Sequence, residues 1–125
     1  MFMSRYWTLS GTLENWRIGL ERGVWGVSER AKPLWEKVEK GDIVVFYATH
    51  NVGVLGYGVV VEKFESREPL WPEEVRQGRA LWPYRIRIRV GEIFNPPKSR
   101  PKGMLVAFAI NKLKEETFRE AIGKP

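Results

Sequence analysis

The sequence predicts an α+β fold in which a strongly bent mixed β-sheet, closed into a small barrel, is flanked by short helices. Two observations lead to this prediction. Residues 42–49 and 54–65 are long, mostly apolar strands, and Gly56 and Gly58 mark places where the second strand bends. Apolar residues in the segment 13–20 instead follow helical spacing, so helices and strands occur in one chain.

The first quarter of the chain predicts a strand, a helix and a shorter strand. Residues 5–9 alternate and are rich in aromatic side chains, which is typical of a strand. Thr12 suits the N-cap of a helix over residues 12–22, and Gly23 suits its end. Residues 24–27 are apolar and predict the short strand.

The middle of the chain predicts one more helix and the centre of the sheet. Residues 33–41 predict the helix, because Pro33 suits a first helical turn and apolar residues then recur one turn apart. Residues 42–49 (DIVVFYAT) are almost all β-branched or aromatic, so we expect this strand to be buried on both faces. A turn at 50–53 leads into the next strand.

The last part predicts a helical turn at 72–77 and then a striped strand at 84–93, where three arginines alternate with apolar residues. Residues 95–103 hold three prolines and three basic residues and predict a loop. An apolar segment at 104–110, strand or buried coil, precedes an amphipathic helix over 114–122.

Composition narrows the class of protein. A chain of 125 residues predicts a single domain over 1–125. It has no cysteine and only one histidine, His50, so we expect no metal, no cofactor and no histidine-based catalysis. Residues 1–11 do not resemble a secretory signal and no apolar run suits a membrane span, so we expect a cytoplasmic protein without a membrane partner.

The net charge of +6, with a sequence pI of about 9.8, favours a polyanionic partner through counterion release from phosphates. A Lys- and Glu-rich surface is equally typical of heat-adapted proteins, so thermostability is a second expectation. Six Trp, four Tyr and six Phe are a heavy aromatic load. We assign Trp7, Trp16 and Trp35 to the core and expect one or two other indoles at a pocket mouth.

Three blocks of sequence resemble the EVE domain, and they span residues 6–90. The first block is Tyr6-Trp7, Trp16 and Gly23-Val24-Trp25-Gly26-Val27; the second is Gly41-Asp42 with Val44-Val45-Phe46-Tyr47; the third is Trp82-Pro83-Tyr84-Arg85-Ile86. The resemblance implies the PUA-like superfold, to which the related YTH domains belong. It also implies recognition of modified bases in DNA or RNA.

The resemblance to YTH-type readers implies an aromatic cage. Trp25 matches the tryptophan that forms one wall, and Trp71 and Trp82 lie where the second wall arises, with Trp82 favoured. Ser10 and, less strongly, Asn15 are candidates for reading the base edge, although Gly11 stands where a relative carries Asn. The remaining candidate ligand-binding residues are Gly26, Lys32, Tyr47 and Tyr84.

Two basic groups are candidates for contacts with the nucleic-acid backbone. Arg85, Arg87 and Arg89 share one face of the striped strand, and the alternative is a solvated face paired with carboxylates. The predicted loop adds a second group, which consists of Lys98, Arg100 and Lys102.

The function that these residues predict is a non-catalytic reader of one base, with 5-methylcytosine among the modified bases considered. Two stacked indoles would hold the two faces of the base. One alternative is a PUA-like hydrolase of modified nucleosides that uses Lys32, Thr49 and Glu62, although their spacing is not diagnostic. Another is a protein-interaction module with an aromatic contact surface.

Overall fold

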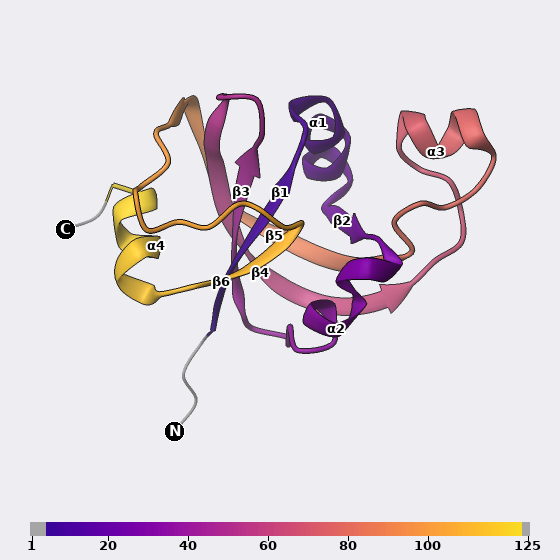
Figure 1. Cartoon of the computed structure of the whole chain (residues 1–125), viewed down its shortest axis with the longest axis horizontal. Helices are drawn as coiled ribbons and strands as arrows, with labels where there is room; N and C mark the ends of the chain where they lie inside the picture. The colour runs from indigo at the N-terminus through magenta and orange to yellow at the C-terminus, as the bar shows by residue number, and fades with distance from the viewer. Residues whose placement is uncertain (1–4, 124–125) are drawn as a thin grey trace.

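The computed structural model describes residues 5–123, in which the strands form one mixed sheet ordered β2-β5-β4-β3-β1-β6 (Figure 1). The strands are β1 (Tyr6–Gly11), β2 (Val24–Val27), β3 (Ile43–Ala48), β4 (Gly53–Glu65), β5 (Tyr84–Lys98) and β6 (Ile110–Leu113). β1 pairs with β3 in parallel, and the other neighbouring strands are antiparallel. The expected mixed α+β sheet is therefore confirmed.

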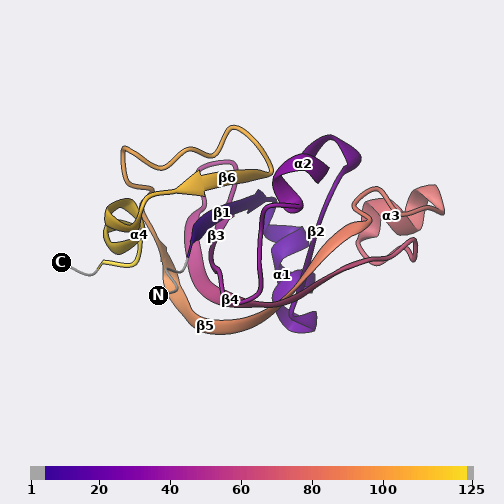
Figure 2. The ribbon, with the colours of Figure 1, turned by 90° about the horizontal axis from the view of Figure 1, so that it is seen from below.

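The bend of the sheet comes from its two longest strands. β4 and β5 curl beneath β3 and β1 (Figure 2). Register shifts between these strands fall at Val54/Gly56, Tyr57/Gly58 and Val60/Glu62. A Cβ at Gly58 would lie 2.5 Å from the carbonyl oxygen of Arg89, so only glycine lets the two backbones approach this closely. Gly56 and Gly58 are thus bend positions, as predicted.

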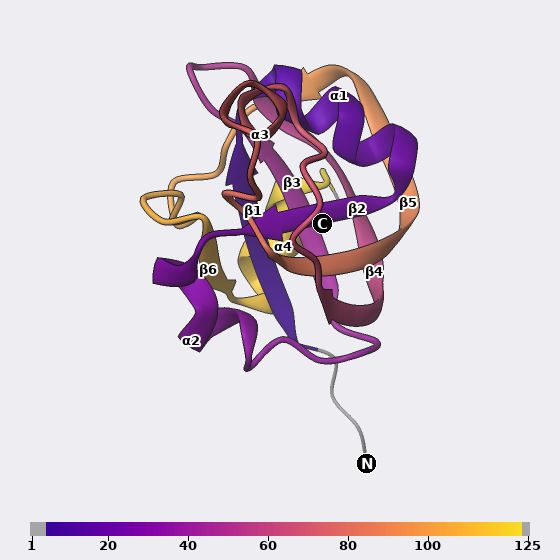
Figure 3. The same ribbon diagram turned by 90° about the vertical axis from the view of Figure 1, so that its right-hand side faces the viewer.

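The chain also forms short helices: α1 (Leu13–Arg22), the 3₁₀ turn η1 (Glu29–Ala31), α2 (Lys32–Trp35), α3 (Pro72–Gln77) and α4 (Glu115–Ala121). Thr12 caps α1 by accepting a hydrogen bond from the backbone N–H of Asn15, and Gly23 ends the helix with φ of 67°. Figure 3 shows β2 leaving the end of α1 and crossing beside the curled strands. Among residues 5–123, no helix has the length and apolar character needed to cross a bilayer.

The predicted helix over 33–41 is wrong beyond Trp35. After α2 the chain tightens into turns, with hydrogen bonds from Lys37 N to Leu34 O and from Val38 N to Trp35 O. Asp42 holds the end of this segment, because its carboxylate accepts both the Trp7 indole N–H and the Glu39 backbone N–H at 2.9 Å. A long-range contact therefore replaces the later helical turns.

The predicted loop at 95–103 also begins too early, because β5 continues through Pro96 and Pro97 to Lys98. At this end β5 pairs with β4 alone, since β2 pairs only with residues 84–87. A proline that lacks an N–H therefore breaks no ladder bond on the open side.

Two clusters of buried side chains stabilise the fold. The larger includes Trp7 and Trp16, with Trp35 packed against it, which agrees with their assignment to the core. The smaller lies under α4 and includes Phe118 and Ile122. The larger cluster also reaches Trp25 and Trp71, so the core continues into the functional site described next.

Candidate functional site

A pocket of about 170 Å³ opens beside β1, the first turn of α1 and β2. We call it the tryptophan pocket. Its lining consists of Ser10, Gly11, Thr12, Asn15, Trp25, Gly26, Trp71, Trp82 and Ala109. Residues from four separate stretches of the chain thus meet at one site.

Three indoles give the pocket its shape. Trp25 is 4% exposed and stacks on Trp16, with ring centroids 3.7 Å apart and planes 7° from parallel. Trp71 stands at 75° to Trp25 and at 88° to Trp82, with centroids 5.8 Å apart in both pairs. Because Trp16 already covers one face of Trp25, a ligand has only the remainder of that ring to contact.

Two buried polar atoms of the lining have no hydrogen-bond partner within residues 5–123: the Trp25 Nε1 donor and the Ser10 hydroxyl. Four other indoles do donate a hydrogen bond: Trp7 to Asp42, Trp16 to Tyr47 O, Trp35 to Arg85 O and Trp71 to Asn15 O. A buried polar group left unpaired costs about 1–3 kcal/mol. Because Ser10 and Trp25 both line the pocket, the polar edge of a ligand held there is a candidate partner for these two atoms.

Glu74 positions the segment that carries two of the indoles. Its carboxylate is fully buried, and Oε1 accepts the backbone N–H groups of Leu70 and Trp71 at 2.8 and 3.2 Å. Oε2 accepts those of Leu81 and Trp82 at 2.8 and 3.0 Å. One side chain therefore holds both ends of the segment that presents Trp71 and Trp82.

Glu74 was not among the site residues predicted from the sequence. The available signal was a glutamate at the third position of a helix that begins at Pro72, since such a residue often accepts the N-cap N–H. Thr12 and Ala109 line the pocket and were likewise not predicted as site residues.

Two glycines allow the walls to close. A Cβ on Gly26 would lie 2.6 Å from the Trp82 carbonyl oxygen and 3.1 Å from Cζ3 of Trp71. A Cβ on Gly11 would overlap the Trp25 ring, 2.6 Å from its Cη2. A larger residue at either position would displace a wall.

The structure brings most candidate ligand-binding residues together and excludes three. Ser10, Asn15, Trp25, Gly26, Trp71 and Trp82 line the tryptophan pocket. Lys32, Tyr47 and Tyr84 do not line this pocket, so the structure does not support their predicted contact with a ligand held there. Tyr84 is buried and donates its hydroxyl hydrogen bond to Glu29 at 2.7 Å, and the Lys32 ammonium lies 5.3 Å from the Tyr84 ring centroid.

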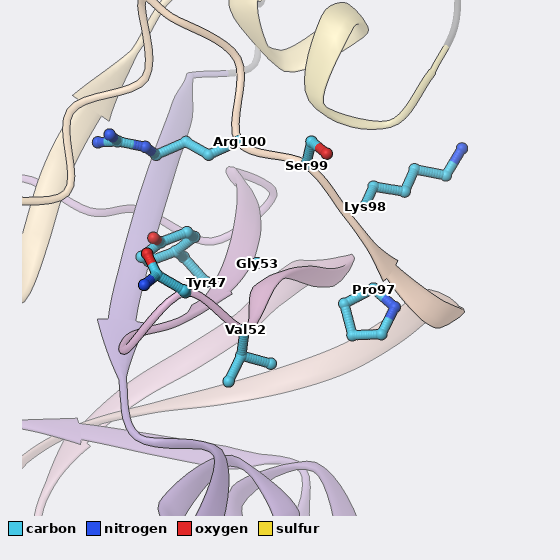
Figure 4. A pocket seen from close by; sticks show the side chains of 8 residues that line it. Tyr47, Val52, Gly53, Pro97, Lys98, Ser99 and Arg100 are labelled. Carbon is cyan, nitrogen blue, oxygen red and sulfur yellow. The ribbon is translucent and has the colours of Figure 1, made fainter.

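Tyr47 lines a different cavity of about 260 Å³, beside Lys98 and Arg100 (Figure 4). Figure 4 shows the Lys98 side chain directed away from Tyr47. Its ammonium donates to Ile122 O at 3.0 Å, where a cation stabilises the C-terminus of α4. Arg100 donates to Met104 O at 3.4 Å. The Lys98 ammonium is thus engaged by the end of α4, whereas Arg100 is exposed with one long hydrogen bond, so its contact with phosphate stays a prediction.

Arg85 is the clearest correction among the basic candidates. It is 4% exposed, and its guanidinium lies 3.3 Å from Glu74 and donates to the carbonyl oxygens of Glu68 and Trp82. A phosphate cannot reach it. Arg87 is exposed but pairs with Glu62 at 2.9 Å. Arg89 and Lys102 are exposed, and their contact with phosphate stays a prediction.

The hydrolase residues do not form a common site around either cavity. Lys32, Thr49 and Glu62 are absent from the linings of the tryptophan pocket and of the cavity in Figure 4. Within residues 5–123, no three carboxylate or imidazole side chains gather as metal ligands.

The Tyr84–Glu29 hydrogen bond predicts a pH-dependent stability. Its formation, together with burial, raises the pKa of Tyr84 above the usual value near 10. The folded state then holds the proton more tightly, so the bond contributes fully below about pH 10 and is lost as the pH rises through the folded-state pKa. We expect Tyr84→Phe to remove this loss in urea unfolding between about pH 8 and 11. Parallel pH curves for the two proteins would contradict the assignment.

The EVE domain family model matches residues 5–116. The chain belongs to the EVE domain family. This EVE domain is 25% identical to a UPF0310 protein of Pyrococcus abyssi, over 91% of this chain and 94% of the relative. A UPF0310 protein of Saccharolobus solfataricus is 22% identical over 66% of this chain and 58% of its own length.

Solved structures show the same fold. The NMR structure of Rpa0253 from Rhodopseudomonas palustris superposes with a TM-score of 0.64 at 13% identity, over 95% of this chain and 91% of that one. The Mmi1 YTH domain in complex with RNA superposes with a TM-score of 0.55 at 16% identity, over 93% of this chain and 62% of that one. The Toxoplasma CPSF4 YTH domain with a 7-mer m6A-modified RNA superposes with a TM-score of 0.54 at 16% identity, over 73% of this chain and 62% of that one. This EVE domain therefore spans 62% of each of these two RNA-bound YTH chains and has the expected PUA-like fold.

Proposed function

We propose that this EVE domain is a non-catalytic reader that holds one base of DNA or RNA, a modified base, in the tryptophan pocket. The observation that carries the proposal is the pair of unpartnered polar atoms, Trp25 Nε1 and Ser10 Oγ, among three indoles. A flipped base offers matching chemistry, because it has aromatic faces for the indoles and a polar edge for the donor and the hydroxyl.

The size of the pocket supports this ligand class. An apolar cavity of about 150 Å³ is enough to hold benzene. The tryptophan pocket, at about 170 Å³ and partly open to solvent, suits one heteroaromatic ring with a small substituent. The two RNA-bound YTH domains that share the fold also support a nucleic-acid partner, as does the net charge of +6.

A methyl group on the base would raise affinity only moderately. Burying one methyl contributes about 0.8 kcal/mol, which is roughly a fourfold preference. The first ligands to compare are therefore matched strands with cytosine, 5-methylcytosine, adenine or N6-methyladenine at one central position, each as DNA and as RNA.

Trp82→Ala tests the base contact, because Trp82 lines the pocket and is only partly buried, packing against the larger core cluster from outside it. Stacking contributes about 1–3 kcal/mol per base, so we expect Trp82→Ala to weaken binding of the preferred strand by roughly 5- to 150-fold. Anisotropy of a labelled strand measures the change. Trp35→Ala is the matched control, because Trp35 is also partly buried but lies outside the pocket.

The salt dependence of binding distinguishes recognition in the tryptophan pocket from phosphate contacts on the basic surface. Phosphate contacts weaken steeply between about 50 and 200 mM salt, whereas the ratio of affinities for two strands that differ in one base should stay constant. The reader function would be overturned if Trp82→Ala and Trp35→Ala bound the strand with equal affinity and the wild-type protein showed no preference among the bases. Release of product from free modified nucleoside would instead favour the hydrolase.

A further inference from the structure

A smaller cavity of about 110 Å³ adjoins the tryptophan pocket, and we call it the side depression. Its lining consists of Ser28, Arg30, Ala31, Leu34, Phe108 and Ala109. Ala109 lines both cavities, and β2, which supplies Trp25 and Gly26 to the tryptophan pocket, leads directly into Ser28. Two chain segments therefore connect one cavity to the other.

Phe108 gives the side depression an aromatic surface. It is 69% exposed, although Phe46, Phe94 and Phe118 are buried. The backbone on which Phe108 stands is fastened, because Asn111 Nδ2 donates to Phe108 O at 2.8 Å and Ser10 N donates to Ala109 O at 3.0 Å. An exposed ring on an anchored backbone is presented to a partner with little loss of entropy on binding.

Arg30 adds a positive charge to the same depression. It is exposed, and none of the ion pairs within residues 5–123 involves it. The neighbouring carboxylate, Glu29, is occupied by the Tyr84 hydroxyl. A guanidinium beside an exposed aromatic ring matches a nucleotide, whose base stacks and whose phosphate accepts hydrogen bonds.

We propose that the side depression binds the nucleotide adjacent to the recognised base, with its base on Phe108 and its phosphate on Arg30. This inference rests on the proposed function. If one base occupies the tryptophan pocket, the nucleotide next to it in the strand must lie on the surface beside the pocket, and the side depression is part of that surface. The EVE domain then reads one base and holds its neighbour through sequence-tolerant stacking.

Phe108→Ala tests the proposal, with Leu105→Ala as matched control. Leu105 is 65% exposed in the same segment and lines neither cavity. The first probes are a seven-nucleotide strand with a central 5-methylcytosine and the corresponding 5-methylcytosine mononucleotide; N6-methyladenine replaces this base if the comparison of strands selects it. We expect Phe108→Ala to weaken binding of the strand about tenfold and to leave binding of the mononucleotide unchanged.

A strand with abasic sites on both sides of the central base completes the design. The wild-type protein should bind it about tenfold more weakly than the intact strand, while Phe108→Ala should bind the two alike. The proposal is overturned if Phe108→Ala binds the intact strand with the same affinity as Leu105→Ala. It is also overturned if Phe108→Ala no longer binds the mononucleotide. If the wild-type protein shows no base preference and no mononucleotide binding, the reader function fails, and this inference fails with it.

Discussion

Glu74→Ala is expected to lower the free energy of unfolding by about 3–5 kcal/mol, because it removes one partner of a buried ion pair. Arg85, which is 4% exposed, would lose the carboxylate that pairs with it. The backbone N–H groups at both ends of the segment 70–82 would also lose their acceptor. Urea unfolding followed by far-UV circular dichroism measures the loss.

The same substitution should abolish base preference even where the protein stays folded, since Trp71 and Trp82 lose their common anchor. Glu73→Ala is the matched control. Glu73 lies in the same helix with an exposed ion pair to Arg76, so its loss should change stability by no more than about 1 kcal/mol. Similar stabilities of the two variants would show that Glu74 does not organise the pocket.

Trp25→Ala has the second large expected effect, a loss of about 3–5 kcal/mol in the free energy of unfolding. The indole is buried between the face of Trp16 and the ring of Trp71, so its removal leaves a cavity in the larger core cluster. Loss of base binding in this variant would therefore not by itself identify Trp25 as a ligand contact. Thermal or urea unfolding measures the stability change directly.

Trp25→Phe separates the structural role from the binding role. It keeps an aromatic ring against Trp16 and removes the unpartnered Nε1 donor, so the stability loss should be smaller than for Trp25→Ala. If Nε1 donates to the base edge, affinity for the preferred strand should still fall by roughly 2- to 13-fold, the equivalent of about 0.5–1.5 kcal/mol. Wild-type affinity in Trp25→Phe would show that the indole nitrogen does not contact the base.

The sequence alone determined the features that depend on short-range pattern. The N-cap and glycine end of α1, the apolar run of β3 and the bends of β4 are local signals, and each appears in the structure. The three blocks that resemble the EVE domain identified the family and placed Trp25 and Trp82 in one pocket.

The tertiary structure decided which side chains are covered and by what. Alternation along β5 places Arg85 and Arg87 on one face, but the segment 70–82 buries only Arg85. Likewise, the role of Glu74 depends on backbone groups up to eight residues away that meet only when the excursion closes on itself. Local pattern fixes the direction of a side chain, whereas burial, ion pairing and the walls of a pocket depend on contacts between segments distant in sequence, and only the folded chain supplies them.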